Sequence, residues 1–171
     1  MNISTSLRFL AWGIVAISFA FRSATAAEWV IGLGADDLFD WDGDPAVAGL
    51  VEVHSNPFFE RPRFNLTGMA TLLVDSERDV FAGIGVHSAW SFRNSRFFLE
   101  GSFAAGGFNQ GGDSPPRKET DSFLYRTSIG VGTRLNETSR LSLTIDHLFN
   151  NDFKNYEPGS ESILLRYSKA F

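Results

Sequence analysis

The stretch Ser122–Leu135, SFLYRTSIGVGTRL, decides the fold class of this chain. Its odd-numbered positions carry Phe, Tyr, Thr, Ile, Val, Thr and Leu, whereas its even-numbered positions carry mainly Ser, Arg and Gly. A period of two residues is that of a β-strand with two unlike faces. The stretch therefore predicts a strand with one apolar face and one face of small and charged side chains.

The same alternation recurs in segments of about ten residues along the rest of the chain, without a long helical period or an internal repeat. Turn-forming sequences separate the segments, namely DWDGDP, NPFFERP, DSER, RNS, NQGGDSPPRKETD and NETS. We predict strands at Glu28–Ala35, Ala46–His54, Arg63–Val74, Asp79–Trp90, Arg96–Gly107, Ser122–Leu135, Arg140–Phe149 and Glu161–Phe171. The predicted fold class is all-β, an eight-stranded antiparallel barrel.

The first segment is predicted to be a secretory signal peptide. It has an early Arg8, an apolar run from Phe9 to Phe21 and the small-residue pattern Ala24-Thr25-Ala26. The apolar run of about 13 residues is shorter than the roughly 20 that a membrane-spanning helix needs. We therefore predict a signal peptide over residues 1–26 and a barrel over residues 27–171.

Composition excludes several classes of function. The chain has 15 Lys and Arg, and removal of Arg8 and Arg22 leaves 13 against 20 Asp and Glu, a net charge of −7. Such an acidic chain lacks the basic surface that nucleic-acid binding requires. It has no cysteine, and His54, His87 and His147 are not spaced as metal ligands. We expect no nucleic-acid partner, no disulfide, no metal and no cofactor.

An eight-stranded barrel can turn its apolar face in either direction. A soluble periplasmic lipid-binding barrel encloses that face, and a transmembrane outer-membrane barrel exposes it to lipid. Three features favour the outer membrane. The chain ends on an apolar strand with Phe171, similar to the terminal strand of bacterial outer-membrane barrels. Glycines such as Gly83 and Gly130 share the polar face with charged residues, which suits a narrow lumen. With both termini in the periplasm, RNS and NETS are short periplasmic turns, and NQGGDSPPRKETD and NNDFKNYEPGS are external loops.

The polar face also carries ionisable residues, which we interpret as hydrogen-bonded and ion-paired inside the barrel. They are Glu28, Glu52, His54, His87, Glu100, Arg126, Arg134, Asp146 and Arg166.

Two ionisable residues fall on the apolar face instead. His147 is near the external end of one predicted strand, and Glu161 is at the external start of the next. Because unpaired groups are costly at lipid-facing positions, we expect a hydrogen bond between them. A glutamate that accepts from one ring nitrogen would leave the other nitrogen as a general base facing lipid. Taken singly, His147 also fits an interfacial aromatic beside Phe149, and Glu161 fits a solvated strand start.

From about Arg96 to Phe171 the chain resembles the lipid A 3-O-deacylases, the PagL-type acyloxyacyl hydrolases of the bacterial outer membrane. The similar stretches are FFLEGSFAAGGF, SIGVGTRL, RLSLTIDHLFN and PGSESILLRYSKAF. The resemblance implies an outer-membrane barrel that hydrolyses an ester-linked acyl chain of lipid A, with lipopolysaccharide as its partner in the membrane. The family motif is a His, any residue, a Ser and an Asn, followed by a Glu fourteen residues after the His.

Carried over by position, the motif implies His147 as the base, Glu161 as the residue that orients it and Asn150 in the oxyanion region. The serine of the motif falls on Phe149, and a phenylalanine cannot attack a carbonyl.

Two nearby serines do not restore the nucleophile directly. Ser162 points to the predicted lumen and Ser160 lies in the predicted loop, so either would need a register change or a bulge. Three interpretations therefore stay open: a deacylase-like ester hydrolase, a catalytically inactive barrel that binds lipid A or supports the envelope, and the soluble periplasmic lipid-binding barrel.

Overall fold

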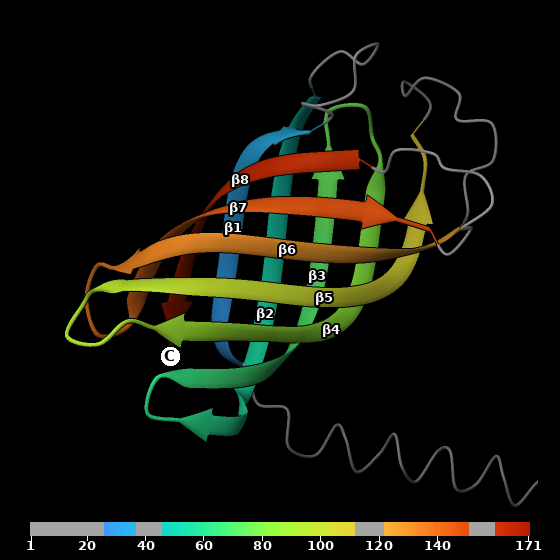
Figure 1. Cartoon of the computed structure of the whole chain (residues 1–171). Coiled ribbons are helices and arrows are strands. Elements are labelled where there is room, and N and C mark those ends of the chain that lie inside the picture. Colours follow the sequence, from blue (N-terminus) through green and yellow to red (C-terminus); the bar gives the residue numbers. More distant parts are fainter. Residues whose placement is uncertain (1–25, 37–45, 112–121, 151–159) are drawn as a thin grey trace, which may run out of the picture.

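The computed structural model describes residues 26–36, 46–111, 122–150 and 160–171. Each strand pairs antiparallel with its neighbours in sequence, and β1 pairs with β8 to close a barrel (Figure 1). The strands are β1 (Ala26–Asp36), β2 (Ala46–Arg61), β3 (Phe64–Asp75), β4 (Val80–Ser91), β5 (Phe97–Asn109), β6 (Phe123–Arg134), β7 (Ser139–Phe149) and β8 (Ser160–Ala170). The predicted fold class is confirmed.

Some of the predicted segments lie outside the described residues. These are the signal peptide, apart from Ala26 at the start of β1, the DWDGDP turn, and most of the loops NQGGDSPPRKETD and NNDFKNYEPGS. No helix in the described ranges is long and apolar enough to cross a membrane.

The hairpin between β2 and β3 differs from the prediction. The sequence predicts a turn at NPFFERP, but β2 continues through Arg61 and β3 begins at Phe64. Pro57 has no backbone N–H to donate to the neighbouring strand, and register shifts on either side of it accommodate this. The rings of Phe59 and Phe64 pack together with centroids 6.1 Å apart. The connection therefore shrinks to Pro62 and Arg63, as short as a periplasmic turn is expected to be.

The two ends of the barrel are distinguished by the termini. Phe171 donates its backbone amide to Ala27 at 3.0 Å, and Ala170 donates to Thr138 in the turn after β6 at 2.8 Å. The turns after β2 and β4 lie at the same end (Figure 1). Because short turns mark the periplasmic side of such barrels, we call this the periplasmic end and the other the external end.

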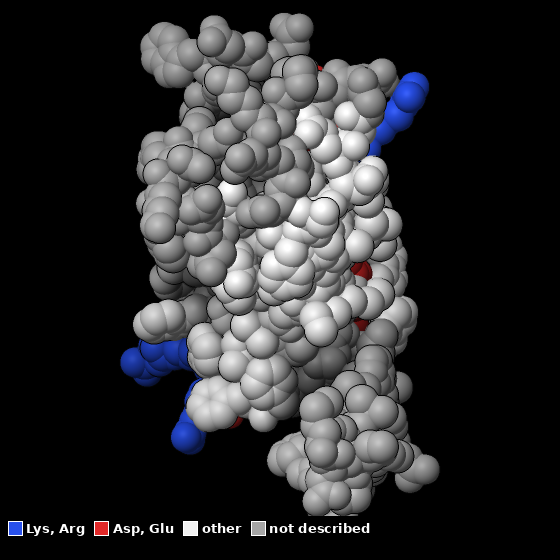
Figure 2. Space-filling model, turned by 90° about the vertical axis from the view of Figure 1, so that its right-hand side faces the viewer, with Lys and Arg blue, Asp and Glu red and all other residues white. Residues whose placement is uncertain are grey.

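Apolar side chains cover the outside of the barrel. Ile84, Ile129 and Leu33 are each about two-thirds exposed or more, at 74%, 67% and 65%. On the side seen in Figure 2, the described surface is white over most of its middle, with a little Asp or Glu at the right-hand edge, and Lys and Arg lie toward its ends. The apolar rows therefore face outward, as predicted for an outer-membrane barrel, and the soluble barrel with its apolar face inward is wrong.

An ion-pair network fills the middle of the lumen, as predicted. Arg126 is fully buried and donates to Glu52 at 2.6 Å and to Asp146 at 2.9 Å. Arg166 also pairs with Glu52. Each charge thus has a partner of opposite sign, without which it would be costly in so narrow an interior.

The two luminal histidines extend this network. The rings of His54 and His87 stack at 4.4 Å. His54 hydrogen-bonds Glu52 at 3.0 Å, and His87 hydrogen-bonds Glu100 at 3.3 Å. Their predicted role in hydrogen bonding inside the barrel is confirmed.

Arg134 lies outside the network, contrary to the prediction. It is exposed at the periplasmic end of β6 and donates to the hydroxyl of Ser91. Its register partner on β7, Arg140, forms an ion pair with Glu28 instead. Arg134 is the last residue of its strand, so its side chain can leave the lumen for water.

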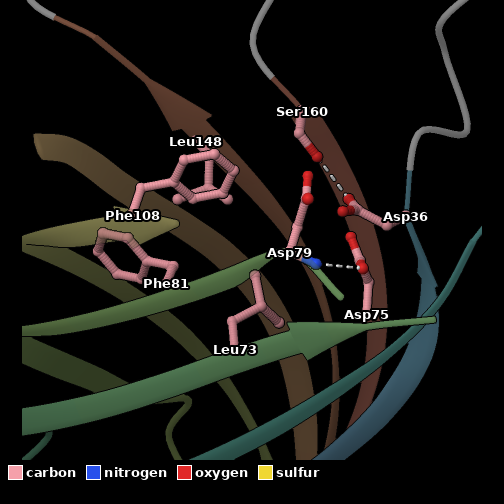
Figure 3. A pocket seen from close by; sticks show the side chains of 8 residues that line it. All are labelled: Asp36, Leu73, Asp75, Asp79, Phe81, Phe108, Leu148 and Ser160. Atoms are coloured by element: carbon pink, nitrogen blue, oxygen red, sulfur yellow. Dashed lines mark hydrogen bonds between the residues drawn. The ribbon is translucent and has the colours of Figure 1, made fainter. Parts of the chain in front are cut away.

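An apolar layer closes the lumen near the external end, where the sequence predicts only small and charged residues. Figure 3 shows apolar side chains from β3, β4, β5 and β7 turned toward one another, next to three aspartates. The apolar residues are Leu73, Phe81, Phe108 and Leu148, and the aspartates are Asp36, Asp75 and Asp79. This layer lies between the buried ion pairs and the external end of the barrel.

Candidate active site

His147 and Glu161 are direct partners in the register between β7 and β8. Their neighbours Asp146 and Ser162 are buried in the lumen, so the alternation of the strands turns His147 and Glu161 outward. The two side chains are partly exposed, at 41% for His147 and 25% for Glu161. Nδ1 of His147 lies 3.0 Å from Oε1 of Glu161. The predicted contact between the two residues is present.

This contact determines what the imidazole can do. A carboxylate only accepts hydrogen bonds, so Nδ1 of His147 is the protonated ring nitrogen and donates the hydrogen bond to Glu161. In the neutral ring Nε2 is then an acceptor, which is the form required of a general base. The catalytic roles of the two residues stay predictions.

Phe149 occupies the outward position two residues after His147. Its ring stacks on the imidazole with centroids 5.4 Å apart and an interplanar angle of 14°. The ring of Phe149 also stacks on Tyr125 of β6, with centroids 5.6 Å apart and an interplanar angle of 29°. The place that the motif gives to a hydroxyl nucleophile is therefore filled by a ring that cannot attack a carbonyl.

The stacking continues onto β5. The rings of Tyr125 and Phe103 lie 5.8 Å apart at 26°. We call His147, Phe149, Tyr125 and Phe103 the aromatic ladder. The outward rows of these strands were predicted, but the contact between Tyr125 and Phe149 was not, because it depends on the register between β6 and β7. The only signal in the sequence is the repeated aromatic residue on outward-facing rows.

The nearby serines are both occupied inside the barrel. Ser160 and Ser162 are buried, and each donates to Oδ1 of Asp36, at 2.7 Å and 2.6 Å. Ser160 was predicted in the loop, but it is the first residue of β8 and has the same inward parity as Ser162. Neither hydroxyl faces the imidazole of His147, so in this register neither is placed to act as a nucleophile beside it.

Asn150 directly follows the last residue of β7. The chain from residue 151 to residue 159 lies outside the described residues, so the oxyanion role of Asn150 stays a prediction. In the described ranges, no group of three His, Cys, Asp or Glu side chains is placed to hold a metal ion.

Comparison with known proteins adds a family and a fold. The family model described as "Lipid A 3-O-deacylase (PagL)" matches residues 28–170. The solved structure of the outer membrane enzyme PagL is similar with a TM-score of 0.64 and 17% identity, covering 85% of this chain and 100% of that one. Neisserial surface protein A is similar with a TM-score of 0.53 and 9% identity, covering 85% and 96%. No curated protein matches the chain.

Proposed function

This chain belongs to the lipid A 3-O-deacylase (PagL) family, and we propose that its outward face at His147 and Glu161 binds lipid A without efficient hydrolysis. The protein is an outer-membrane β-barrel, so this face contacts the membrane. The observation that carries the proposal is the ring of Phe149, stacked on His147 where the family motif has its serine.

The proposed binding surface combines two kinds of contact. The aromatic ladder offers flat apolar surface to acyl chains, but lipid tails are equally apolar, so this contact contributes packing rather than a hydrophobic driving force. Selectivity for a glycolipid would come from the polar pair. With Nδ1 committed to Glu161, Nε2 of His147 can accept a hydrogen bond from a hydroxyl or amide group of lipid A.

The absent nucleophile explains why hydrolysis should be inefficient. In a catalytic triad the serine forms a covalent intermediate, which divides a difficult step into two easier ones. Loss of a triad member leaves a residual acceleration of about 10³ to 10⁴ over water. The ring of Phe149 also excludes an ester carbonyl from the space beside the imidazole.

A second candidate function is slow ester hydrolysis by water that His147 activates directly. The intact contact between His147 and Glu161 at 3.0 Å favours it, because that pair is what a general base and its orienting residue require.

The test uses the refolded barrel in vesicles that contain lipopolysaccharide and phospholipid. Native mass spectrometry measures the lipid A that stays bound, and mass spectrometry of the extract measures the 3-hydroxy fatty acid released. We expect enrichment of lipid A over phospholipid, reduced severalfold by His147→Phe, which removes the Nε2 acceptor. Val51→Ala, which removes an outward side chain of β2, should leave it unchanged, because β2 carries no residue of the aromatic ladder. We also expect no fatty-acid release above that of empty vesicles.

The outcomes separate the candidates. Equal retention of lipid A and phospholipid would contradict the binding proposal. Steady release that His147→Ala abolishes would favour the second candidate, and release that survives His147→Ala would place the chemistry elsewhere.

A further inference from the structure

Four arginines surround an open hollow at the periplasmic end of the barrel. The hollow has a volume of about 660 Å³. Its arginines come from three successive periplasmic turns and adjoining strand ends: Arg63 after β2, Arg93 and Arg96 after β4, and Arg134 at the end of β6. We call this the arginine hollow.

The backbone fixes these arginines relative to one another. Ser91 donates its amide to the carbonyl of Arg63 at 2.7 Å, and Arg134 donates its amide to the carbonyl of Arg96 at 2.9 Å. The side chain of Arg134 also donates to the hydroxyl of Ser91. Asn94 has a φ of 53°, a left-handed conformation that asparagine tolerates and that allows the tight turn between Arg93 and Arg96.

The positive charge of the hollow is not neutralised by the described part of the protein. There, none of the four arginines forms an ion pair with a carboxylate, whereas Arg126, Arg140 and Arg166 each do. Guanidinium groups are matched in geometry to phosphate, which they bind with two parallel hydrogen bonds. The arrangement therefore suits an anion with several oxygen atoms.

The surroundings of the hollow point to a lipid as the source of that anion. Phe92 lines it, and Trp90 and Phe97 are exposed beside it, at 58% and 63%. Exposed aromatic residues at strand ends mark the boundary between hydrocarbon and headgroups in membrane barrels. Arg93 directly follows Phe92 and Arg96 directly precedes Phe97 in the chain, so these arginines lie at the depth of the headgroups of the inner leaflet.

We propose that the arginine hollow binds the phosphate of an anionic phospholipid in the periplasmic leaflet of the outer membrane. The acyl chains of that lipid lie along the outward faces of β4 and β5, and two or more guanidinium groups hold its headgroup. This interaction would bind acidic lipid at the periplasmic end of the barrel, whereas the candidate active site is at the external end. It does not depend on lipid A.

The test reconstitutes the full barrel in vesicles made of phosphatidylglycerol and phosphatidylcholine in equal amounts. Native mass spectrometry measures the ratio of the two lipids that remain bound. We expect enrichment of phosphatidylglycerol in the unaltered protein. Arg93→Gln or Arg96→Gln should lower that enrichment about three- to tenfold, because each removes a charge-assisted hydrogen bond. The matched control is Arg61→Gln, an exposed arginine of the same barrel end that stacks on Phe59 outside the hollow.

Further arms make each outcome decisive. Arg134→Gln should lower the enrichment as well. Because Arg134 lies at the end of β6, this variant can be measured even if Arg93→Gln and Arg96→Gln, in the turn after β4, prevent folding. Equal binding of the two lipids, or an equal loss with Arg61→Gln, would overturn the proposal. Inorganic phosphate is added in a separate arm. If it displaces phosphatidylglycerol at low millimolar concentration, the hollow is a site for a free anion and the lipid assignment is wrong.

Discussion

The ring of Phe149 lies 5.4 Å from the ring of His147 and nearly parallel to it, at an angle of 14°. Phe149, the residue that falls on the serine position of the family motif, is therefore packed against the candidate base itself. Removing it opens a space beside the imidazole, and a serine there places a hydroxyl on the same outward row. The predicted absence of a nucleophile can therefore be tested by introducing one.

We predict that Phe149→Ser raises the release of fatty acid from lipopolysaccharide. The serine hydroxyl would stand next to a base that Glu161 already orients, so the covalent route becomes available. Mass spectrometry of the released 3-hydroxy fatty acid gives the rate. The control is Phe58→Ser, which removes an exposed aromatic residue of β2 near the periplasmic end, outside the aromatic ladder, and should leave the rate unchanged. Equal rates for Phe149→Ser and Phe58→Ser would show that Phe149 is not in the nucleophile position.

In the Phe149→Ser background, Glu161→Gln is predicted to lower the rate by about 10² to 10⁴, as loss of the orienting carboxylate does in serine hydrolases. The amide can still contact the ring, but it lacks the negative charge that stabilises an imidazolium. The rate is measured as above. Glu137→Gln, in the turn after β6 at the other end of the barrel, is the matched control. A rate that survives Glu161→Gln would reduce the hydrogen bond to a purely structural contact.

The placement of His147 and Glu161 could be predicted from the sequence because it requires only two simple facts. The two-residue period assigns each side chain to a face, and strands that are consecutive in the chain are neighbours in an antiparallel barrel. Both facts are local or nearly so. His147 and Glu161 also flank the same external connection, so their proximity could be expected without knowledge of any other wall of the barrel, and the structure supplies the register and the distance of 3.0 Å.

Features that depend on pairing between strands could not be predicted in this way. The sequence marks Pro57 as a turn residue, but β2 stays extended beyond it, because register shifts accommodate Pro57, Phe59 pairs with Leu66 and its ring packs on Phe64. The stack of Tyr125 on Phe149 depends on the register between β6 and β7, which the period leaves open. The apolar layer of Leu73, Phe81, Phe108 and Leu148 results from packing between side chains of different strands across the lumen. The alternation along one strand gives no information about such contacts.

The close approach of β4 and β5 leads to a prediction about two adjacent glycines. A Cβ at Gly106 would lie 2.1 Å from the carbonyl oxygen of Ala82 and 2.4 Å from Cα of Gly83. Gly106→Ala should therefore cost about 1 to 3 kcal/mol of stability through overpacking. A Cβ at Gly107 meets nothing closer than 3.9 Å, so Gly107→Ala should be neutral or stabilising by about 0.4 to 1 kcal/mol. Urea unfolding of the barrel in lipid vesicles measures both, and equal effects would show that the inner wall at Gly106 is not packed tightly.

The luminal network gives the largest expected loss of stability. Arg126 is fully buried and contacts Glu52, Asp146 and the hydroxyl of Thr71. Arg126→Met leaves Asp146 buried beside an apolar side chain, whereas Glu52 keeps its contact with Arg166. Breaking a buried ion pair from one side typically costs about 3 to 5 kcal/mol. Urea unfolding in vesicles, followed by the heat-dependent shift of the folded barrel on gels, should show a loss of that size.

Two further variants separate this loss from a general effect of removing an arginine. Arg61→Met removes an exposed arginine outside the arginine hollow and should change stability by no more than about 0.5 kcal/mol. The double variant Arg126→Met with Asp146→Asn should be more stable than Arg126→Met alone, because the unpaired charge is gone. If Arg126→Met matched Arg61→Met, the network would fill the lumen without contributing to the stability of the barrel. If the double variant were no more stable than Arg126→Met, the loss of stability would come from the lost packing of the Arg126 side chain rather than from the unpaired carboxylate of Asp146.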